Sequence, residues 1–279
     1  MDRHESILIR KRREYRDITN KYFGEDSSGS AITLKDLVNR AKTCPSIDFN
    51  DLILHQINID IPRTCPELLV FQVPKVQGSL LRILYCWSIR RPATGYVQGI
   101  NDLVTPFYST FLASSDPETL SSDEMFAIEA DTFWCLSNLL DTIQDSYTFN
   151  QSGIYRQVSL LREITLRMDP QLVKHLESEG VQFIQFAFRW MNCLLLREFS
   201  LPTIQRLWDS YLSEGSDGFK SFHPYICAAF LLKWRRELQV LEFQDIIVFL
   251  QRPPTENWTG RDVEMLVAEA FVLKSLFNK

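Results

Sequence analysis

The sequence predicts an all-α protein. Apolar residues recur at spacings of three and four along most of the chain, as they do on the buried face of a helix. Strand-turn signals are missing, because the one Asp-Gly pair, at 217–218, precedes a helical pattern instead of joining two strands. With 279 residues, 45% of them hydrophobic, the chain can bury a large core, and its length favours one or two domains.

Composition excludes several classes of protein. The net charge of −5 argues against a nucleic-acid-binding protein. The six cysteines are scattered without a CxxC pair, which is typical of a reduced, cytoplasmic protein rather than a disulfide framework. The charged N-terminus predicts no signal peptide, and the longest apolar runs are too short to cross a bilayer. We therefore expect a cytoplasmic protein without direct membrane insertion.

The first predicted helix, 2–23, has a charged side and an apolar side. The residues expected on its apolar side are Ile7, Leu8, Tyr15, Ile18, Tyr22 and Phe23. The basic run 10–13 would suit an anionic surface, but the neighbouring Glu5, Glu14 and Asp17 favour a solvated helix face. A loop at 24–30 follows, and Thr33 is expected to cap a helix that ends near Lys42. A short helix is expected at 46–55.

Residues 56–102 are the centre of the prediction, because two unusual loops there flank one helix. The loop at 55–64 contains Arg63 directly after a proline, and the loop at 95–102 contains Gln98 directly before a glycine. Between them, apolar residues at 80, 83, 84 and 87 predict an amphipathic helix, which the proline at 92 and the glycine at 95 end. An arginine loop and a glutamine loop can thus share one surface.

The remaining elements are also predicted to be helices. Residues 103–112 are expected to form a buried helix, and Ser122 to open a capping box ahead of a long amphipathic helix that reaches Ile143. A break at 150–153 divides the chain into an N-terminal half, about 1–150, and a C-terminal half, about 151–279. In the second half, helices are expected at 154–168, 170–178, 181–197, 201–213, 218–237, 240–250 and 260–277. The aromatic-rich helix at 181–197 is interpreted as core rather than as a cofactor pocket.

Signatures of stand-alone enzymes are missing from the sequence. It contains no phosphate-binding P-loop, no GxGxxG, no GxSxG elbow and no set of kinase motifs. The four histidines are too scattered in sequence to predict a zinc site, so no metal and no bound cofactor are expected.

Ile57-x-x-Asp60-x-x-Arg63, followed by Tyr96-x-Gln98-Gly99, is the most specific pattern in the chain. Motifs of the IxxDxxR and YxQ type resemble those of TBC domains, the catalytic modules of Rab GTPase-activating proteins. The segments HQINIDIPRT (55–64), GYVQGINDLVTPF (95–107), FIQFAFRWMNCLLLREF (183–199) and RLWDSYL (206–212) are especially similar to the Golgi-associated Rab-GAP subgroup of yeast and its animal relatives. The resemblance covers about 8–277, and the family's usual first segment, with Gly-Ile-Pro and a tryptophan-bearing helix, is absent.

The resemblance implies a TBC domain over 1–279, with two helical subdomains forming a V-shaped groove for a GTP-bound Rab/Ypt small GTPase. It implies a dual-finger mechanism in which Arg63 stabilises the phosphoryl charge and Gln98 positions the attacking water. An arginine finger is worth roughly 10³–10⁵ in rate, or about 4–7 kcal/mol of barrier. The activity would be GTPase activation in trans, with GTP and Mg²⁺ carried by the Rab. It would regulate vesicle trafficking, with peripheral recruitment to Golgi or endomembranes.

Five neighbours are predicted to support the two fingers: Asp60, Tyr96, Gly99, Asn101 and Asp102. Asp60 is expected to pair with Arg63 and hold it extended. Gly99 permits a tight turn after Gln98, and Asn101 and Asp102 are expected to cap the next helix. Tyr96 is expected to pack the loop and to leave its hydroxyl for a partner.

Two alternatives remain at this point. The chain could be a non-catalytic Rab-binding or scaffold module, although the presence of both fingers favours activity. It could also be a hydrolase that uses His55 and Asp60 directly, but these residues lack an activating partner at a known motif spacing.

Overall fold

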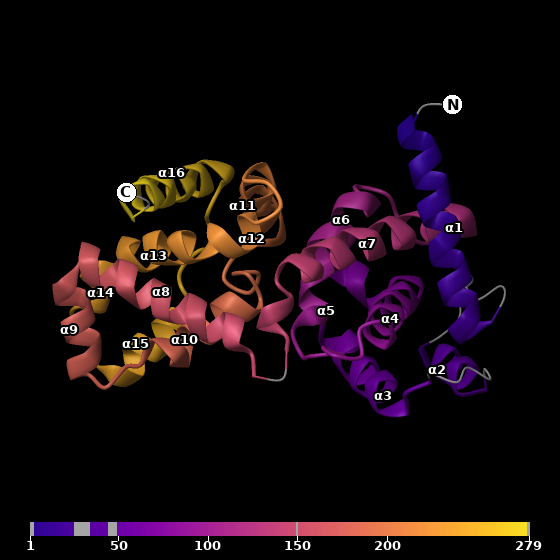
Figure 1. The fold of residues 1–279 in the computed structure, drawn as a ribbon, viewed down its shortest axis with the longest axis horizontal. Helices are drawn as coiled ribbons and strands as arrows, with labels where there is room; N and C mark the ends of the chain where they lie inside the picture. The colour runs from indigo at the N-terminus through magenta and orange to yellow at the C-terminus, as the bar shows by residue number, and fades with distance from the viewer. Residues whose placement is uncertain (1–2, 25–33, 44–48, 149, 278–279) are drawn as a thin grey trace. The chain divides into compact units, whose positions relative to one another are not determined.

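The computed structural model describes residues 3–24, 34–43, 49–148 and 150–277, and all the regular elements in these ranges are helices (Figure 1). No strand occurs in them, so the all-α prediction is confirmed. The chain forms two compact units, Met1–Asp141 and Thr142–Lys279. The boundary between them thus lies before the break at 150–153 that the sequence suggested.

The first unit is built around α4. Its α-helices are α1 (Arg3–Phe23), α2 (Leu34–Thr43), α3 (Asp51–Asp60), α4 (Pro74–Ile89), α5 (Ile100–Leu103), α6 (Thr105–Leu112) and α7 (Ser122–Thr142). Two short 3₁₀ turns, η1 (Ile61–Arg63) and η2 (Leu69–Gln72), lie between α3 and α4. Helices α1, α2, α3 and α5 all pack on α4, so the segment between the two predicted loops is the core element of this unit.

Helix α4 is more deeply buried than the sequence predicted. The expected apolar residues at 80, 83, 84 and 87 are buried, but so is every other residue from 78 to 88. Arg82 is tolerated there because its guanidinium forms a double ion pair with Glu129 of α7, at 2.8 and 2.6 Å. The hydroxyl of Tyr15 donates a third hydrogen bond to Glu129, at 2.8 Å. α4 is therefore a central helix rather than an amphipathic surface helix.

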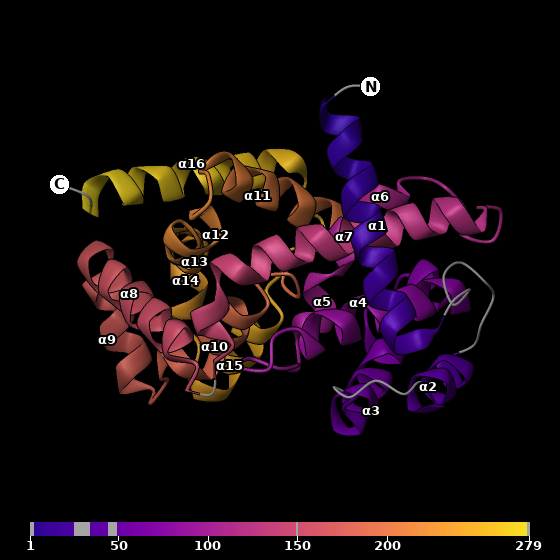
Figure 2. The ribbon, with the colours of Figure 1, turned by 45° about the vertical axis from the view of Figure 1, so that its right-hand side comes forward.

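Helix α1 crosses α7 in both views of the ribbon (Figures 1 and 2). The crossing is held by a two-point ion pair between Arg12 and Asp131 and by a 2.9 Å hydrogen bond from the Trp134 indole to the Lys11 carbonyl. The predicted apolar side of this helix is only partly correct. Tyr15, Tyr22 and Phe23 are buried, but Ile7 and Leu8 near the N-terminal end are 40% and 44% exposed.

Several helix boundaries in the first unit differ from the prediction. The short helix expected at 46–55 is α3, which begins at Asp51; residues 46–48, like the loop at 25–30 and Thr33, lie outside the described ranges. The buried helix expected at 103–112 is divided into α5 and α6, with a proline in the first turn of α6. The capping box involves Ser121 and Glu124, not Ser122, since Ser121 N–H donates to Glu124 at 2.9 Å.

The second unit is built around α13. Its α-helices are α8 (Ser152–Met168), α9 (Pro170–Ser178), α10 (Phe183–Asn192), α11 (Leu201–Ser213), α12 (Gly218–Ser221), α13 (His223–Lys233), α14 (Arg235–Leu238), α15 (Phe243–Gln251) and α16 (Gly260–Phe277), preceded by the 3₁₀ turn η3 (Gln144–Ser146). Helices α8, α10, α12, α14 and α16 pack on α13. The aromatic residues of α10 are core, since Phe186 and Trp190 are at most 2% exposed.

Three predictions in the second unit are corrected. The helix expected at 181–197 ends at Asn192, because Leu194 and Leu195 take left-handed conformations with φ of +50° and +61°. The helix expected at 218–237 is divided into α12, α13 and α14. Gly153 is not in a break but inside α8, where an added Cβ would lie 2.8 Å from the backbone of η3. That glycine permits close packing rather than a chain reversal.

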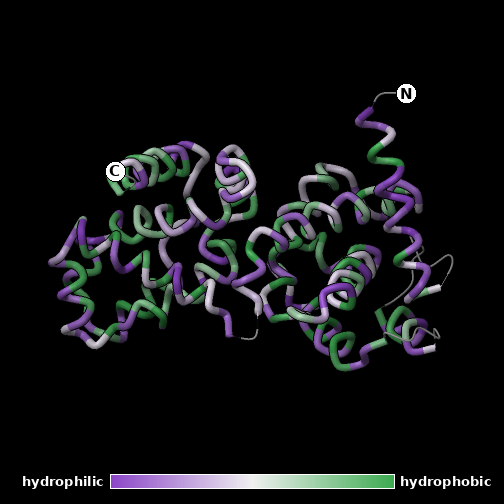
Figure 3. The backbone as a smooth tube through the Cα atoms, in the orientation of Figure 1, coloured by the Kyte–Doolittle hydropathy of each residue, from purple (hydrophilic) through white to green (hydrophobic). Residues whose placement is uncertain are grey.

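Hydrophobic and hydrophilic residues alternate along most helices when the backbone is coloured by hydropathy (Figure 3). This mixing is expected when each helix buries one side. Over the described ranges, no helix is both long and apolar enough to cross a membrane.

Candidate functional site

The arginine loop is a tight continuation of α3. Asn50 caps that helix, its side chain accepting hydrogen bonds from two backbone N–H groups at 3.1 Å each. At the other end the chain passes directly into η1, with Pro62 in its first turn. Thr64 then closes the turn, because its N–H donates to the Ile61 carbonyl and its hydroxyl to the Asp60 carbonyl, at 3.0 and 3.1 Å. Arg63 is thus held by a short turn, with an exposed side chain.

The glutamine loop connects α4 to α5. Gly95, with φ of +62°, donates its N–H to the Arg91 carbonyl at 2.7 Å and turns the chain away from α4. Gln98 is exposed, and Gly99 follows it with φ of +105°. Few side chains adopt this conformation without strain, so the glycine is required where the chain turns sharply into α5. The loop therefore projects Gln98 outward just before a buried helical turn.

Hydrogen bonds among five polar side chains connect the two loops. We call these side chains the loop network: Gln56, Asp60, Thr64, Tyr96 and Asn101. The Tyr96 hydroxyl donates to Asp60 Oδ2 at 2.9 Å, and Gln56 Nε2 donates to the same oxygen at 3.3 Å. Asn101 Nδ2 donates to Thr64 Oγ1 at 3.0 Å, and Asn101 Oδ1 accepts from the backbone N–H after Gln98, at 3.1 Å. The arginine loop and the glutamine loop are therefore connected at two points, which the contact between the Tyr96 hydroxyl and Asn101 Oδ1, at 3.3 Å, links to each other.

Three of the five members of the loop network are buried, although Arg63 and Gln98 are exposed, Tyr96 is half-buried and Gln56 is exposed. Asp60, Thr64 and Asn101 are at most 4% exposed. Burial, and next the negative charge of Asp60, raise the pKa of Tyr96 well above its usual value. The Tyr96 hydroxyl consequently remains protonated and can donate to Asp60 at any physiological pH. A hydrogen bond to a buried carboxylate is among the stronger kinds, so it can fix the geometry of both loops.

The family assignment follows from the sequence as well as from the fold. Residues 39–240 match the Rab-GTPase-TBC domain. Among curated relatives, the GTPase-activating protein gyp1 of Schizosaccharomyces pombe is 50% identical over 99% of this chain and 52% of its own length. TBC1 domain family member 22A of Homo sapiens is 44% identical over 99% of this chain and 52% of its own length. The chain belongs to the TBC domain family.

Solved structures agree with the assignment of this TBC domain. The crystal structure of the Ypt/Rab-GAP domain of Gyp1p matches with a TM-score of 0.86 and 48% identity, over 99% of this chain and 83% of that one. The flagellar RabGAP TBC domain of Chlamydomonas, at 18% identity and a TM-score of 0.58, shares the fold. The chain spans about half the length of the curated relatives it matches.

Three details of the predicted site are corrected by the TBC domain structure. Asp60 pairs with Tyr96 and Gln56, and within the described ranges no ion pair joins it to Arg63. The Tyr96 hydroxyl is used inside the protein and is not left for a partner. Neither Asn101 nor Asp102 is the N-cap of α5, since Gly99 occupies that position without a side-chain cap.

Sequence reasoning also missed part of the site. Thr64 was not predicted, although its buried hydroxyl connects Asn101 to the arginine loop. Two polar residues of the motifs, Asp60 and Tyr96, are expected from the sequence to have separate roles, yet they are hydrogen-bonded to each other. The sequence shows only that both motifs place polar residues among apolar ones. This pattern does not indicate which of the polar residues form hydrogen bonds with each other.

Neither a metal site nor a hydrolytic pair is evident in the described residues. No group of three or more His, Cys, Asp or Glu side chains in these ranges is placed to hold a metal ion. His55 is exposed on α3 and forms no hydrogen bond to Asp60 in the described structure.

Proposed function

We propose that this TBC domain accelerates GTP hydrolysis by a small GTPase of the Rab/Ypt class. The observation that carries the proposal is the pair of exposed side chains, Arg63 and Gln98, on two loops that share one hydrogen-bond network, in which Asp60, Thr64 and Asn101 are buried. A flexible loop would have to order its finger at each encounter, which costs entropy. Loops already fixed by buried hydrogen bonds avoid most of that cost.

Arg63 is assigned to the transferring phosphoryl group. Its side chain is exposed, and no ion pair to it occurs in the described part of the chain, so its charge is not neutralised internally. A guanidinium is planar, permanently charged and able to meet two phosphate oxygens at once. Supplied from outside, such a group stabilises the charge that develops on the γ-phosphoryl oxygens.

Gln98 is assigned to the attacking water. A side-chain amide can accept a hydrogen bond from water and donate one to a phosphoryl oxygen, which aligns the water for in-line attack. Gln98 precedes a glycine that turns the chain sharply, so its side chain extends from the loop. GTP and Mg²⁺ would be carried by the Rab, and the domain would need no cofactor of its own.

The biological role follows from the same proposal. Return of a Rab to its GDP form ends its signal on a membrane, so the domain would regulate vesicle trafficking. The similarity of the sequence to the Golgi-associated subgroup supports a Rab of the Golgi or endomembranes, to which the protein would be recruited peripherally.

The test is a panel of purified, GTP-loaded Rab proteins, with release of inorganic phosphate measured with and without this protein. We expect one or a few members of the panel to be accelerated by orders of magnitude. A panel in which Rabs bind in the GTP form but none is accelerated would replace the catalytic assignment with a binding module. Absence of both binding and acceleration would reject the Rab partner.

A further inference from the structure

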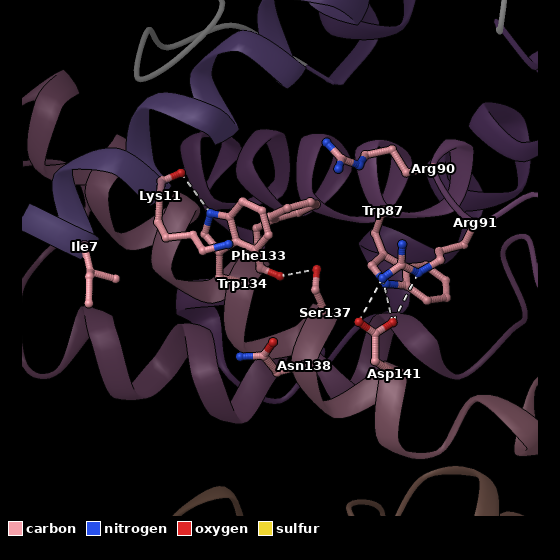
Figure 4. A pocket seen from close by; sticks show the side chains of 10 residues that line it. All are labelled: Ile7, Lys11, Trp87, Arg90, Arg91, Phe133, Trp134, Ser137, Asn138 and Asp141. Carbon is pink, nitrogen blue, oxygen red and sulfur yellow. Dashed lines mark hydrogen bonds and ion pairs between the residues drawn. The ribbon is translucent and has the colours of Figure 1, made fainter. Parts of the chain in front are cut away.

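A cavity of about 440 Å³ lies within the first unit, between α1, the C-terminal end of α4, and α7 (Figure 4). It is within the size range of small-ligand pockets. Aromatic side chains of α4 and α7 form much of its wall, and polar groups lie at its edge. No residue of the loop network lines it, so it is a separate feature from the two fingers.

The cavity carries more positive than negative charge. Lys11, Arg90 and Arg91 line it, against one carboxylate among the described lining residues, that of Asp141. Arg91 is paired with Asp141 through contacts of 2.6 and 2.8 Å. Lys11 Nζ lies 3.6 Å from the centre of the Trp134 ring and 3.5 Å from Glu14 Oε2, so its charge is partly neutralised. In the described part of the chain, no ion pair engages Arg90, so its charge is available.

The positive charge extends beyond this cavity. Arg90 and Arg91 also line a neighbouring hollow of about 450 Å³, which Lys21 of α1 shares. Figure 4 shows Arg91 directed toward Asp141, with the Arg90 guanidinium apart from that ion pair. Arg90 thus stands between two hollows, where a bound anion would meet its guanidinium.

One buried donor at the cavity is unsatisfied. Trp87 lines the wall and is 4% exposed, and its indole N–H finds no acceptor within the described structure. The other indole of the wall, that of Trp134, donates to a backbone carbonyl. Buried donors are nearly always paired in native proteins, so an unpaired one in a cationic wall indicates an acceptor supplied from outside.

An exposed apolar turn adjoins the cavity. Ile7, Leu8 and Ile9 are 40–44% exposed, and Ile7 lines the cavity itself. Figure 3 shows this as a hydrophobic turn near the N-terminal end of an otherwise largely hydrophilic α1. Three consecutive helical residues cannot all face one core, so at least part of this turn remains in contact with solvent.

We propose that this cavity binds a phosphate monoester, and that the adjoining apolar turn favours one carried on a lipid headgroup. Guanidinium and ammonium groups around an indole donor provide the charge-assisted hydrogen bonds that phosphate oxygens accept. Apolar side chains beside a basic site enter the boundary region of a bilayer while the charges contact the headgroups. The site would hold the domain at a phosphorylated membrane surface, independently of the fingers.

The test has a soluble arm and a vesicle arm. In the first, inositol 1,4,5-trisphosphate is titrated into the protein and tryptophan fluorescence is followed, because Trp87 and Trp134 line the cavity. In the second, sedimentation compares phosphatidylcholine vesicles containing phosphatidylinositol 4-phosphate with vesicles of equal charge containing phosphatidylserine. We expect saturable binding in the first arm and preference for the phosphomonoester lipid in the second.

Two variants should shift the affinity in opposite directions. Arg90→Gln is expected to weaken binding by about 10-fold, the effect of one charge-assisted hydrogen bond. Asp141→Asn is expected to tighten it, because the change removes the carboxylate and releases Arg91. Arg236→Gln, at an exposed cation of the second unit, is the matched control and should have no effect.

A third variant distinguishes the source of the phosphate. Leu8→Ser should weaken binding to vesicles without changing the affinity for inositol 1,4,5-trisphosphate. If wild type binds vesicles no more tightly than the soluble phosphate, the ligand is a free phosphate ester and the lipid assignment is wrong. No saturable binding in either arm, or binding that Arg90→Gln and Asp141→Asn leave unchanged, would overturn the site. Rab-dependent GTP hydrolysis in solution should be the same for Arg90→Gln and wild type.

Discussion

The two units of this TBC domain use buried polar side chains in different ways. In the first unit, the loop network joins the two loops that carry the exposed Arg63 and Gln98, and its members Asp60, Thr64 and Asn101 are almost fully buried. In the second unit, His223 is fully buried between the Tyr211 hydroxyl, at 2.7 Å, and the Trp190 carbonyl, at 3.0 Å. One network positions surface loops, whereas the other joins core helices.

The difference suggests how each network contributes. Polar groups in a core must be satisfied or the fold loses stability. Polar groups beneath an exposed loop also determine where that loop holds its side chains. Variants of the core networks should therefore change the free energy of unfolding, and variants of the loop network should change the rate of GTP hydrolysis by more than their effect on stability explains.

The largest change is expected at the core ion pair of the first unit. Glu129→Leu leaves Arg82 buried without its partner and should lower the free energy of unfolding by about 3–5 kcal/mol, measured by urea denaturation. The double variant Arg82→Met/Glu129→Leu removes both charges and should recover most of the loss. If Glu129→Leu alone is as stable as wild type, burial of the Arg82–Glu129 ion pair does not make it a determinant of stability.

A pH-dependent change is expected in the core of the second unit. Burial lowers the pKa of His223 from 6.5 to about 4. Between these values the unfolded chain binds a proton that the folded chain does not, so stability falls as the pH falls. The loss from this group is about 3 kcal/mol at its full extent. His223→Gln should remove this contribution to the pH dependence. The free energies of unfolding measured with urea at pH 7 and pH 4.5 should then differ less for the variant than for wild type. Equal pH dependence in both proteins would contradict the assignment.

A smaller change in stability, with a larger change in rate, is expected at Asn101. Asn101→Ala removes the bridge to Thr64 and should lower stability by about 1–3 kcal/mol. Misplacement of both fingers should slow single-turnover GTP hydrolysis roughly 10–100-fold. Asn138→Ala, at an exposed asparagine of the same unit, is the control and should alter neither quantity. If Asn101→Ala lowers stability alone, the loop network is merely structural.

The smallest change is expected when a single hydroxyl is removed from the loop network. Tyr96→Phe deletes the donor to Asp60, while Gln56 still contacts that carboxylate. The free energy of unfolding should therefore fall by only about 1 kcal/mol. Because the pKa of Tyr96 is raised well above its usual value, its hydroxyl stays protonated from pH 6 to 9. The ratio of the GTP hydrolysis rates with wild type and with Tyr96→Phe should therefore be constant over this range. Tyr155→Phe, at a tyrosine 54% exposed, serves as the control. A ratio that changes within that range would indicate that the hydroxyl ionises.

Much of the fold could be predicted from local patterns. Helices such as α1, α9 and α16 begin and end within about two residues of the prediction, because caps, prolines and helical periodicity are local properties. The errors occurred where tertiary packing determines the conformation. The sequence predicts a break at Gly153, because the close approach of η3 cannot be inferred from the sequence, and the left-handed Leu194 and Leu195 carry no local signal.

For the candidate site, the sequence indicates which residues to consider but not which hydrogen bonds they form. Two motifs in a fixed order contain Arg63 and Gln98. That Asp60 contacts Tyr96 instead of Arg63 depends on how two loops 30 residues apart fold against each other, and Thr64 had no feature that distinguishes it from any other threonine after a turn. The cavity between α1, α4 and α7 likewise depends on three helices coming together.

The most direct test of the account is single-turnover GTP hydrolysis by a responsive Rab at saturating protein, with wild type, Arg63→Ala and Gln98→Ala. Both side chains are exposed, so both variants should fold with wild-type stability and still bind the Rab. Arg63→Ala is expected to slow hydrolysis roughly 10³-fold or more, and Gln98→Ala is also expected to slow the chemical step. A variant at either position that binds the Rab and hydrolyses GTP at the wild-type rate would contradict the two-finger mechanism.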